Sequence, residues 1–401
     1  MNSNVVVTRR NIFQRLGDSI KGILIGLLLV VVSFPVLFLN EGRAVKTAKS
    51  LEEGAAAVVS VRADVVDAAN EGALVHVTAD VEVSEALSDE LFGLTVHSAT
   101  GLKRTVEMFQ WREESTTQTR TTVGGTEERV TTYSYRQEWS SNLIRSSNFN
   151  DPSYQNPSDM PYPDVTLHPS SAGFGAFRLT SAHLARFSSF QPIHLTDEAL
   201  EQMPAAVRAG FQVHNGALFR GAEPANPAIG DVRISFSQVP AASATVVGRQ
   251  TGDTFTGYPT QAGRQLLFVR SGVAAADEVF SDAMAANTFL TWLLRFAGGL
   301  LMFVGLTLIF KPLSVLASVL PIAGSIVATG TGIVAFLISA SVSLVVIAFA
   351  WIFYRPLLGI LLLVVAGGLA FGLKKVWKPA PRAEDPSPAP VTGGTEPPST
   401  V

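Results

Sequence analysis

The sequence predicts an α+β membrane protein with four transmembrane helices, one N-terminal and three C-terminal, and a large strand-rich non-cytoplasmic domain between the first and the second. Three observations predict this class. Of 401 residues, 47% are hydrophobic and only 16% charged, which is more apolar than is usual for soluble proteins. Long uncharged stretches lie toward both ends of the chain. Short alternating patterns typical of strands fill the middle.

The charge distribution separates the middle of the chain from its ends. Residues 41–288 contain 19 basic and 29 acidic side chains, whereas the rest contains 11 and 4. An acidic middle region argues against a nucleic-acid partner, because phosphate binding needs clustered Lys and Arg. The chain has no cysteine, which excludes disulfides, zinc-thiolate sites, iron-sulfur clusters and a cysteine nucleophile.

The first transmembrane helix is predicted at residues 22–39. These 18 residues carry no charge and reach about 27 Å as a helix, enough to cross a bilayer. A cleaved signal peptide has a shorter apolar core and a small-x-small cleavage site, whereas Asn40 and Glu41 follow here. We therefore expect an uncleaved signal anchor, preceded by a basic cytoplasmic N-terminus at residues 1–21.

The C-terminal third predicts three further transmembrane helices, at residues 289–310, 332–354 and 357–373. Positive residues precede the first transmembrane helix and follow the last, which indicates that both chain ends are cytoplasmic. They are Arg9, Arg10, Arg15 and Lys21 at the first helix and Lys374, Lys375, Lys378 and Arg382 after the last. Four crossings satisfy this if residues 311–331, which contain proline and glycine, form a re-entrant or interfacial segment. Residues 374–401 are rich in proline and small polar residues, which predicts a disordered cytoplasmic tail.

Residues 40–288 predict an α+β domain dominated by strands, and 150–171 is the most plausible internal joint. Two strands, at 105–112 and 129–139, flank a polar stretch that predicts a long hairpin loop. The other strands are expected at 73–83, 210–220, 231–239, 244–249 and 265–270. Helices are expected at 180–190, 196–203 and 275–287, the last running directly into the second transmembrane helix.

The small and charged residues in the apolar helices are expected to serve packing and helix ends rather than a binding site. Gly22 and Gly26 form a G-x-x-x-G pattern, which allows close helix packing within one bundle or between two copies. Arg295 and Arg355 lie near helix ends, so we expect them to snorkel toward water without a functional role.

No sequence motif indicates catalysis, a cofactor or a metal. The six histidines, all in the middle domain, lack metal-ligand spacing, and no nucleophile-elbow, HExxH or phosphate-loop pattern occurs. A catalytic pair assembled from residues distant in sequence would leave no such motif. Just after the first apolar stretch, Arg43, Lys46 and Lys49 recur every three residues. This stripe could hold lipid headgroups, or simply continue the anchor helix into interfacial water.

Several blocks of sequence closely resemble the LUMA family, also called the transmembrane protein 43 family, in order and with matching spacing. They are NEGRAVKTAKSLEEG (40–54), VEMFQW (106–111), YSYRQEW (133–139), NPSDM (156–160), GDVRISFS (230–237) and FYRPL (353–357). The residues that carry the resemblance are Asn40, Glu41, Gly42, Arg43, Trp111, Tyr135, Trp139, Gly230, Asp231, Arg233, Tyr354, Arg355 and Pro356. The family assigns no catalytic role to them.

The resemblance implies an integral membrane protein that self-associates and organises other membrane proteins, without established catalysis. Family members in animals occupy the endoplasmic reticulum and inner nuclear membrane. The proline-rich tail departs from the animal pattern, and the alanine-rich, cysteine-free composition indicates a bacterial source, hence a plasma or inner membrane. The nuclear partners of animal members would then not transfer.

These observations lead to a non-enzymatic membrane scaffold as the predicted function. Its expected partners are membrane lipids, further copies of itself and other membrane proteins, but not nucleic acid. The alternative is a membrane-bound enzyme or lipid-handling protein whose acid and base groups meet only in the fold. A channel built around residues 312–331 is a third hypothesis.

Overall fold

The computed structural model describes residues 3–122, 126–319 and 321–356. It confirms a mixed α+β protein with a strand-rich region and three helices long and apolar enough to cross a membrane. The chain divides into two units, residues 1–350 and 351–401. The predicted fourth transmembrane helix at 357–373 and the tail at 374–401 lie outside the described residues, so both stay predictions.

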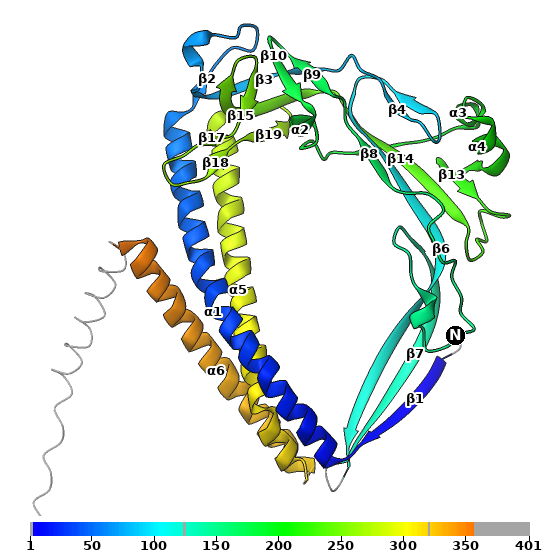
Figure 1. Ribbon diagram of the computed structural model, residues 1–401, viewed down its shortest axis with the longest axis vertical. Coiled ribbons are helices and arrows are strands. Elements are labelled where there is room, and N and C mark those ends of the chain that lie inside the picture. Colours follow the sequence, from blue (N-terminus) through cyan, green and yellow to red (C-terminus); the bar gives the residue numbers. More distant parts are fainter. Residues whose placement is uncertain (1–2, 123–125, 320, 357–401) are drawn as a thin grey trace, which may run out of the picture. The chain divides into compact units, whose positions relative to one another are not determined.

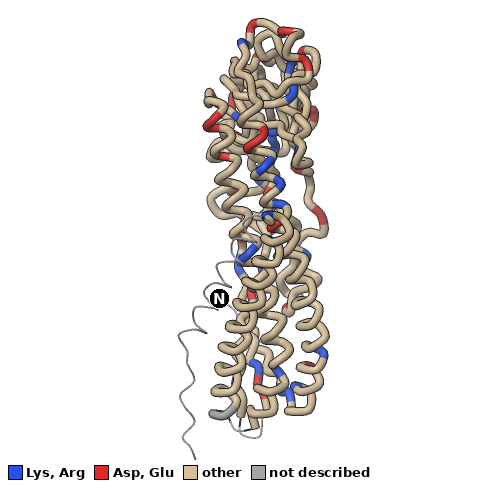
Figure 2. The backbone as a smooth tube through the Cα atoms, turned by 90° about the vertical axis from the view of Figure 1, so that its left-hand side faces the viewer, with Lys and Arg blue, Asp and Glu red and all other residues tan. Residues whose placement is uncertain are grey.

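The first two apolar helices, α1 (Ile12–Ala57) and α5 (Ala276–Ala317), lie side by side (Figure 1). A capping box begins α1, because the Asn11 side chain accepts from the Gln14 backbone N–H at 2.8 Å and the Gln14 side chain accepts from the Asn11 N–H at 3.1 Å. This satisfies two N–H groups that a helix start otherwise leaves unpaired. In Figure 2 the helical part is mostly uncharged, with Lys, Arg, Asp and Glu gathered toward its ends.

Within the described residues, 311–317 and 321–331 are helical and 318–319 form a turn. Helix α5 continues through Pro312 to Ala317, and α6 (Pro321–Tyr354) begins four residues later. The prediction of a re-entrant or interfacial segment rested on Pro321, Gly324 and Gly330; Pro321 begins α6, and the two glycines lie inside it. Apolar helices tolerate glycine better than soluble ones do, so Gly324 and Gly330 do not interrupt α6. How this segment lies in a membrane stays a prediction.

The larger of the two main sheets has eight strands, all paired antiparallel. Its core contains Val106, Met108, Ile234 and Phe236, with exposed fractions of 0–1%. The strand order is β1 (Ser3–Arg10), β7 (Glu127–Ser140), β6 (Ala99–Thr121), β14 (Val232–Pro240), β13 (Ala217–Arg220) and β12 (Gln212–His214), with β11 (Gln191–Ile193) on β14 and β8 (Val165–Leu167) on β6.

The N-terminal residues belong to this sheet, which the sequence analysis did not anticipate. Strand β1 pairs with β7 from Ser3 opposite Ser134 to Arg10 opposite Glu127. Its run of three valines favours a strand, and the two arginines that follow lie opposite Glu128 and Glu127 of β7. The pairing places the tip of the β6–β7 hairpin beside the start of α1, where Arg15 Nε lies 3.2 Å from Glu127 Oε2.

The β6–β7 hairpin is long enough for that contact. At about 3.3 Å per residue, the 23 residues of β6 extend about 76 Å, comparable with about 69 Å for the 46 residues of α1. The stretch predicted as a loop, 114–128, is therefore mostly strand. Among the described residues, the strands continue to Thr121 and resume at Glu127.

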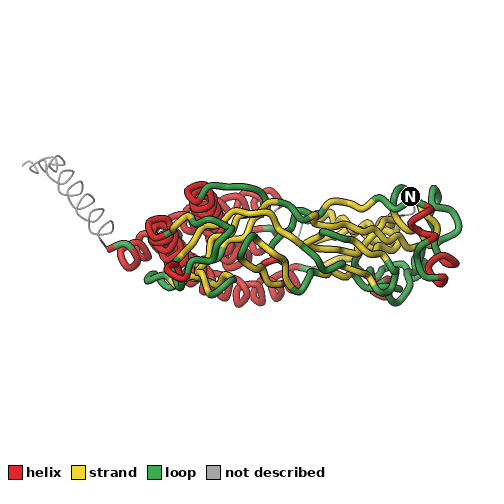
Figure 3. The backbone as a smooth tube through the Cα atoms, turned by 90° about the horizontal axis from the view of Figure 1, so that it is seen from above, coloured by secondary structure: helices red, strands yellow, loops and turns green. Residues whose placement is uncertain are grey.

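The second sheet has seven strands and its own core, built from residues such as Val75, Val77 and Phe174. Figure 3 shows strands and loops extending away from the long helices. The strands are β10 (Phe177–Thr180), β9 (Ser171–Phe174), β3 (Leu74–Glu82), β15 (Ser243–Thr251) and β16 (Thr254–Thr256), with β19 (Phe268–Ser271) on β15 and β2 (Val59–Ser60) on β3. Two ribbons pair β17 (Tyr258–Pro259) with β18 (Gln265–Leu266) and β4 (Leu87–Asp89) with β5 (Leu94–Val96).

The helices within the strand domain are short. They are η1 (Ala68–Asn70), η2 (Ser146–Asn148), α2 (Ser181–Leu184), α3 (Asp197–Glu201) and α4 (Ala205–Gly210). The helix predicted at 180–190 therefore has only one turn. The helix predicted at 275–287 is confirmed as the start of α5 and runs into the apolar stretch without interruption.

The predicted joint at 150–171 packs along the large sheet. The Asn156 side chain accepts from the Trp111 backbone N–H at 2.7 Å and donates to the Trp111 carbonyl at 2.9 Å. The Asp164 carboxylate accepts from the Val106 N–H at 2.7 Å. Polar side chains here replace a missing neighbouring strand, which explains a loop rich in Asn, Asp and Pro.

A third apolar cluster attaches the helices to the smaller sheet. Leu51 of α1 and Phe280 of α5 are 3% and 5% exposed and pack with Leu74, Val247 and Leu266 from the sheet region. This cluster lies beyond the apolar stretches 22–39 and 289–310, so the strand domain begins directly where these stretches end.

Candidate functional site

A polar junction lies between α1 and α5 where the apolar stretches end. It comprises Asn40, Glu41, Arg43, Asn287, Thr291 and Arg295. Arg295 donates to both carboxylate oxygens of Glu41, at 2.6 and 2.9 Å, and its guanidinium lies 4.7 Å from the Trp292 ring centroid. Glu41 is only 2% exposed. The expectation that Arg295 snorkels toward water is therefore wrong, because a buried carboxylate one helix away binds it instead.

Side-chain amides satisfy the rest of the polar junction. Asn40 donates to the Thr291 carbonyl at 3.0 Å, and Asn287 donates to the Ala44 carbonyl at 3.1 Å. Arg43 donates to the side-chain oxygen of Asn287 at 2.9 Å. Burial of polar groups is costly unless they are hydrogen-bonded, so these reciprocal bonds fix how the two helices face each other.

The predicted basic stripe divides in the structure. Arg43 turns toward α5 and lines a cavity, whereas Lys46 and Lys49 are exposed on α1. Gly42 is buried within the same helix. Of the three basic residues, only Arg43 is therefore placed to act together with groups from other elements.

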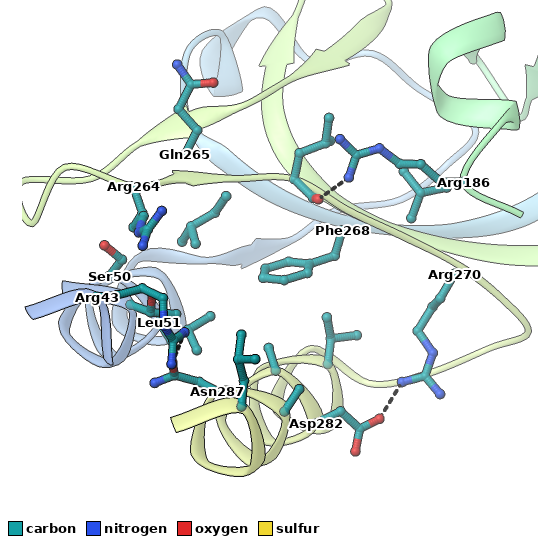
Figure 4. A pocket seen from close by; sticks show the side chains of 18 residues that line it. Arg43, Ser50, Leu51, Arg186, Arg264, Gln265, Phe268, Arg270, Asp282 and Asn287 are labelled. Carbon is teal, nitrogen blue, oxygen red and sulfur yellow. Dashed lines mark hydrogen bonds and ion pairs between the residues drawn. The ribbon is translucent and has the colours of Figure 1, made fainter. Parts of the chain in front are cut away.

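The cavity beside the polar junction has a volume of ≈ 810 Å³. Its walls come from α1, from α5 and from the segment 264–270, which includes β18 and β19 (Figure 4). Apolar side chains such as Leu51, Phe268 and Val279 form much of the lining. Four arginines and one carboxylate also line it, namely Arg43, Arg186, Arg264, Arg270 and Asp282. We refer to it as the arginine pocket.

Of the four arginines in the arginine pocket, only Arg270 forms an ion pair within the described parts of the chain. Arg270 is paired with Asp282 at 3.0 Å, but Arg186 donates to the Leu267 carbonyl at 2.9 Å, and Arg43 donates to neutral side chains. Burial and the positive charge of Arg264 lower the pKa of Arg43, while Glu41 acts in the opposite sense. Among the described residues, Arg264 has no side-chain partner. Sequence reasoning missed this pocket because its arginines are far apart in the chain.

Two aromatic residues of the family blocks meet on the hairpin. Tyr135 is 6% exposed and stacks on Tyr154 at 3.9 Å, while Trp111 contacts the same ring edge-on at 4.7 Å. The Tyr135 hydroxyl donates to Glu113 at 2.6 Å and accepts from the Asp151 N–H at 3.0 Å. Burial, together with the Glu113 hydrogen bond, raises the pKa of Tyr135 to about 12.

Replacement of Tyr135 by Phe is expected to lower the free energy of unfolding by about 1–2 kcal/mol, because Glu113 and the Asp151 N–H each lose a partner. The raised pKa also predicts that the wild type loses stability as pH rises from about 10 to 12, since tyrosinate is favoured in the unfolded chain. Thermal unfolding between pH 8 and 11 tests both. Y135F should lack the tyrosine part of this pH dependence, and an unchanged profile would contradict the assignment.

The remaining family residues of the large sheet form a separate cluster. Arg233 binds Glu107 at 2.6 Å and lies 4.7 Å from the Trp139 ring centroid, so one guanidinium joins two strands. Gly230 has φ +94°, a conformation that glycine adopts readily. Asp231 accepts from the Ala228 N–H at 2.8 Å and thereby closes this turn.

Tyr354, Arg355 and Pro356 lie in the second unit, at the end of α6. The Arg355 N–H donates to the Trp351 carbonyl at 2.7 Å, and the Tyr354 ring lies 5.0 Å from that of Phe353. These contacts are local to the end of the helix and define no binding site.

The two glycines predicted for helix packing differ. A Cβ atom at Gly26 would lie 2.5 Å from the Gly305 carbonyl oxygen of α5, whereas one at Gly22 would meet only Leu308, at 4.0 Å. Gly26 therefore serves packing within the chain, where the helix backbones approach closely.

The described histidines lie apart from the arginine pocket. No cluster of His, Asp and Glu with metal-ligand geometry occurs among the described residues. His76 is bonded to Ser60 and the Ala274 carbonyl, and His183 to Thr180. The arginine pocket, with its guanidinium groups and apolar lining, is suited to holding an anion against an apolar wall.

Together, the apolar helices and the strand domain attached to them define an integral membrane protein. The chain belongs to the transmembrane protein 43 family, whose model matches residues 108–356. It is 35% identical to Transmembrane protein 43 of Rattus norvegicus, over 87% of this chain and 88% of the relative, and 34% identical to that of Homo sapiens over the same shares. The Transmembrane protein 43 homolog of Drosophila melanogaster is 31% identical over 85% of this chain and 90% of its own. No solved structure matches.

Proposed function

We propose that this protein is a non-enzymatic membrane scaffold that self-associates and organises other membrane proteins or lipids beside its strand domain. The basic residues after position 373 support a cytoplasmic C-terminus. Residues 22–39 act as a signal anchor, and the body of the strand domain faces the non-cytoplasmic side. Strand β1 and the part of the β6–β7 hairpin around Glu127 lie at the opposite, cytoplasmic end of α1. The membrane is the plasma or inner membrane in a bacterium, and the endoplasmic reticulum or inner nuclear membrane in a eukaryote.

The exposed edge of β1 carries the self-association proposal. Within the described parts of the chain, β1 is the last strand of the large sheet and pairs only with β7. Val5 and Val7 are 57% and 53% exposed. An edge strand offers a row of unpaired backbone groups, and soluble proteins usually protect such edges with charge or proline. Eight residues with an apolar centre suit strand addition by a second copy.

The contacts of α1 give a second reason for assembly. This helix meets the strand domain near both ends, through Arg15 with Glu127 and through Ser50 with Thr260. The β6–β7 hairpin therefore extends over a length similar to that of the apolar stretch between these contacts. It carries charged side chains such as Glu114, which are costly in contact with acyl chains. Packing against further copies would shield them.

The assembly is tested by native mass spectrometry of the full chain in nanodiscs. We expect a discrete homo-oligomer for the wild type and a shift to monomer when Val5 and Val7 are both replaced by Lys, because charge on an edge opposes strand addition. Leu91→Lys is the matched control, since Leu91 is apolar and 48% exposed but lies outside this edge. A wild-type monomer would contradict the proposal.

Lipid handling is the second candidate function, and the arginine pocket favours it. The pocket combines unneutralised guanidinium groups with apolar walls directly beyond the apolar stretches of α1 and α5. The enzymatic alternative has no comparable support, because no histidine from the described part of the chain lines this cavity.

A further inference from the structure

The arginine pocket has the size and position of a site for an amphiphile. Its volume of ≈ 810 Å³ falls within the range of about 300–1,000 Å³ typical of small-molecule sites. Leu290, which belongs to the apolar stretch of α5, lines the cavity and is 39% exposed. Arg43 and Ser50 lie beyond the apolar stretch of α1. The cavity therefore connects the region of acyl chains with a polar wall.

The polar wall is suited to a phosphate group. Figure 4 shows the Arg264 and Arg43 side chains near Ser50, with Asn287 on the facing helix. Guanidinium groups bind phosphate oxygens through two parallel N–H donors. Arg43 is held in place by bonds to Asn40, Asn287 and Thr291, so its position is fixed before a ligand arrives. Arg264 is exposed, and its guanidinium is uncommitted among the described residues.

The apolar wall is suited to an acyl chain. Leu51, Leu266 and Val279 are buried at 3–4% exposure, and Phe268 stands in the cavity between the sheet and α5 (Figure 4). The Phe268 ring packs against Phe280 at 5.8 Å, which holds it upright. A free inorganic anion would leave this surface uncovered, whereas a chain of methylenes would bury it at a gain of about 0.8 kcal/mol per buried CH₂.

We propose that the arginine pocket binds a phosphate-bearing amphiphile, with the phosphate between Arg43 and Arg264 and the acyl chain along Phe268 toward Leu290. The proposal rests on the lipid-handling part of the proposed function and is independent of self-association. It also assigns the headgroup contact to Arg43 with Arg264, rather than to the exposed Lys46 and Lys49 of the predicted stripe.

Binding is tested by titrating the full-length protein in detergent with three probes. They are oleoyl lysophosphatidic acid, oleoyl lysophosphatidylcholine and inorganic phosphate. We expect native mass spectra to show one lysophosphatidic acid bound per chain. Its dissociation constant should be at least tenfold lower than that of either other probe. The choline lipid has the same chain but a zwitterionic head, and inorganic phosphate has the charge but no chain, so the comparison separates a lipid source from a free anion.

Two variants locate the site. Arg264→Gln should weaken lysophosphatidic acid binding at least tenfold. Arg208→Gln is the control, because Arg208 lies outside the pocket lining, and it should leave this binding unchanged. Leu290→Gln should weaken binding of the lipid and leave binding of inorganic phosphate unchanged. Equal affinity for the lipid and inorganic phosphate, or unchanged lipid binding in R264Q, would overturn the proposal. The same spectra count the copies per complex, so loss of lipid without loss of the oligomer contradicts only this site.

Discussion

Replacing Glu41 by Gln is expected to lower the free energy of unfolding by about 3–5 kcal/mol. Glu41 is buried, and both of its carboxylate oxygens accept from Arg295. The amide of Gln has nearly the same shape but no charge, so the substitution leaves the guanidinium of Arg295 without its counter-charge in a largely buried position. The loss of this ion pair, rather than a change in packing, accounts for most of the destabilisation.

The measurement is thermal unfolding of the detergent-solubilised protein followed by circular dichroism. Lys46→Gln, which also removes one charge from α1 but at an exposed position, should change stability by less than about 0.5 kcal/mol. Combining Glu41→Gln with Arg295→Met should recover part of the loss, because removal of both charges eliminates the unpaired one. A small effect of E41Q alone would mean that water reaches this ion pair.

Replacing Gly26 by Leu is expected to destabilise the packing of α1 against α5 by about 3 kcal/mol, at the upper end of the usual cost of overpacking. A side chain at position 26 would collide with the backbone of α5. The Gly305 carbonyl oxygen would lie 2.5 Å from the new Cβ, and a backbone atom cannot move aside as a flexible side chain can. The two helices would have to separate along this contact.

Gly22→Leu is the matched control for Gly26→Leu. It introduces the same side chain one helical turn earlier, where a Cβ atom has only an ordinary contact at 4.0 Å. Resistance to unfolding in sodium dodecyl sulfate should fall strongly for G26L and little for G22L. Equal effects would indicate that helix propensity or lipid contact, rather than close approach to Gly305, determines the outcome.

The elements with clear periodicity could be predicted from sequence. The alternation in 231–239 and 73–83 matches β14 and β3 closely, and the continuous helix from 275 into the apolar stretch is α5. Strand β1 was not predicted because its partner is over a hundred residues away. A three-valine segment beside two arginines is compatible with several structures until β7 is present to pair with it.

The candidate site was only partly predictable. Asn40 and Glu41 indicated an uncleaved anchor and carried the family resemblance, but no polar junction was predicted there, although Asn and Glu directly after an apolar stretch need hydrogen-bond partners. Sequence could not show that Asn287 and Arg295 provide them, because helix α5 begins more than two hundred residues later. The arginine pocket was even less predictable from the sequence. Arg186, Arg264 and Arg270 lie in segments without a common motif, and only the fold brings them to one cavity.

The attachment of α1 at two separated points restricts rotation of the helix about its own axis. Near its start, Arg15 is tied to Glu127, and near its end the Glu53 carboxylate accepts from the Gln261 N–H at 2.9 Å. A twist of the helix would break one contact or the other. The same lipid-facing stripe, which includes Leu24 and Leu28 at 71% and 61% exposure, is therefore presented at all times. A signal carried through this helix would have to move the strand domain with it.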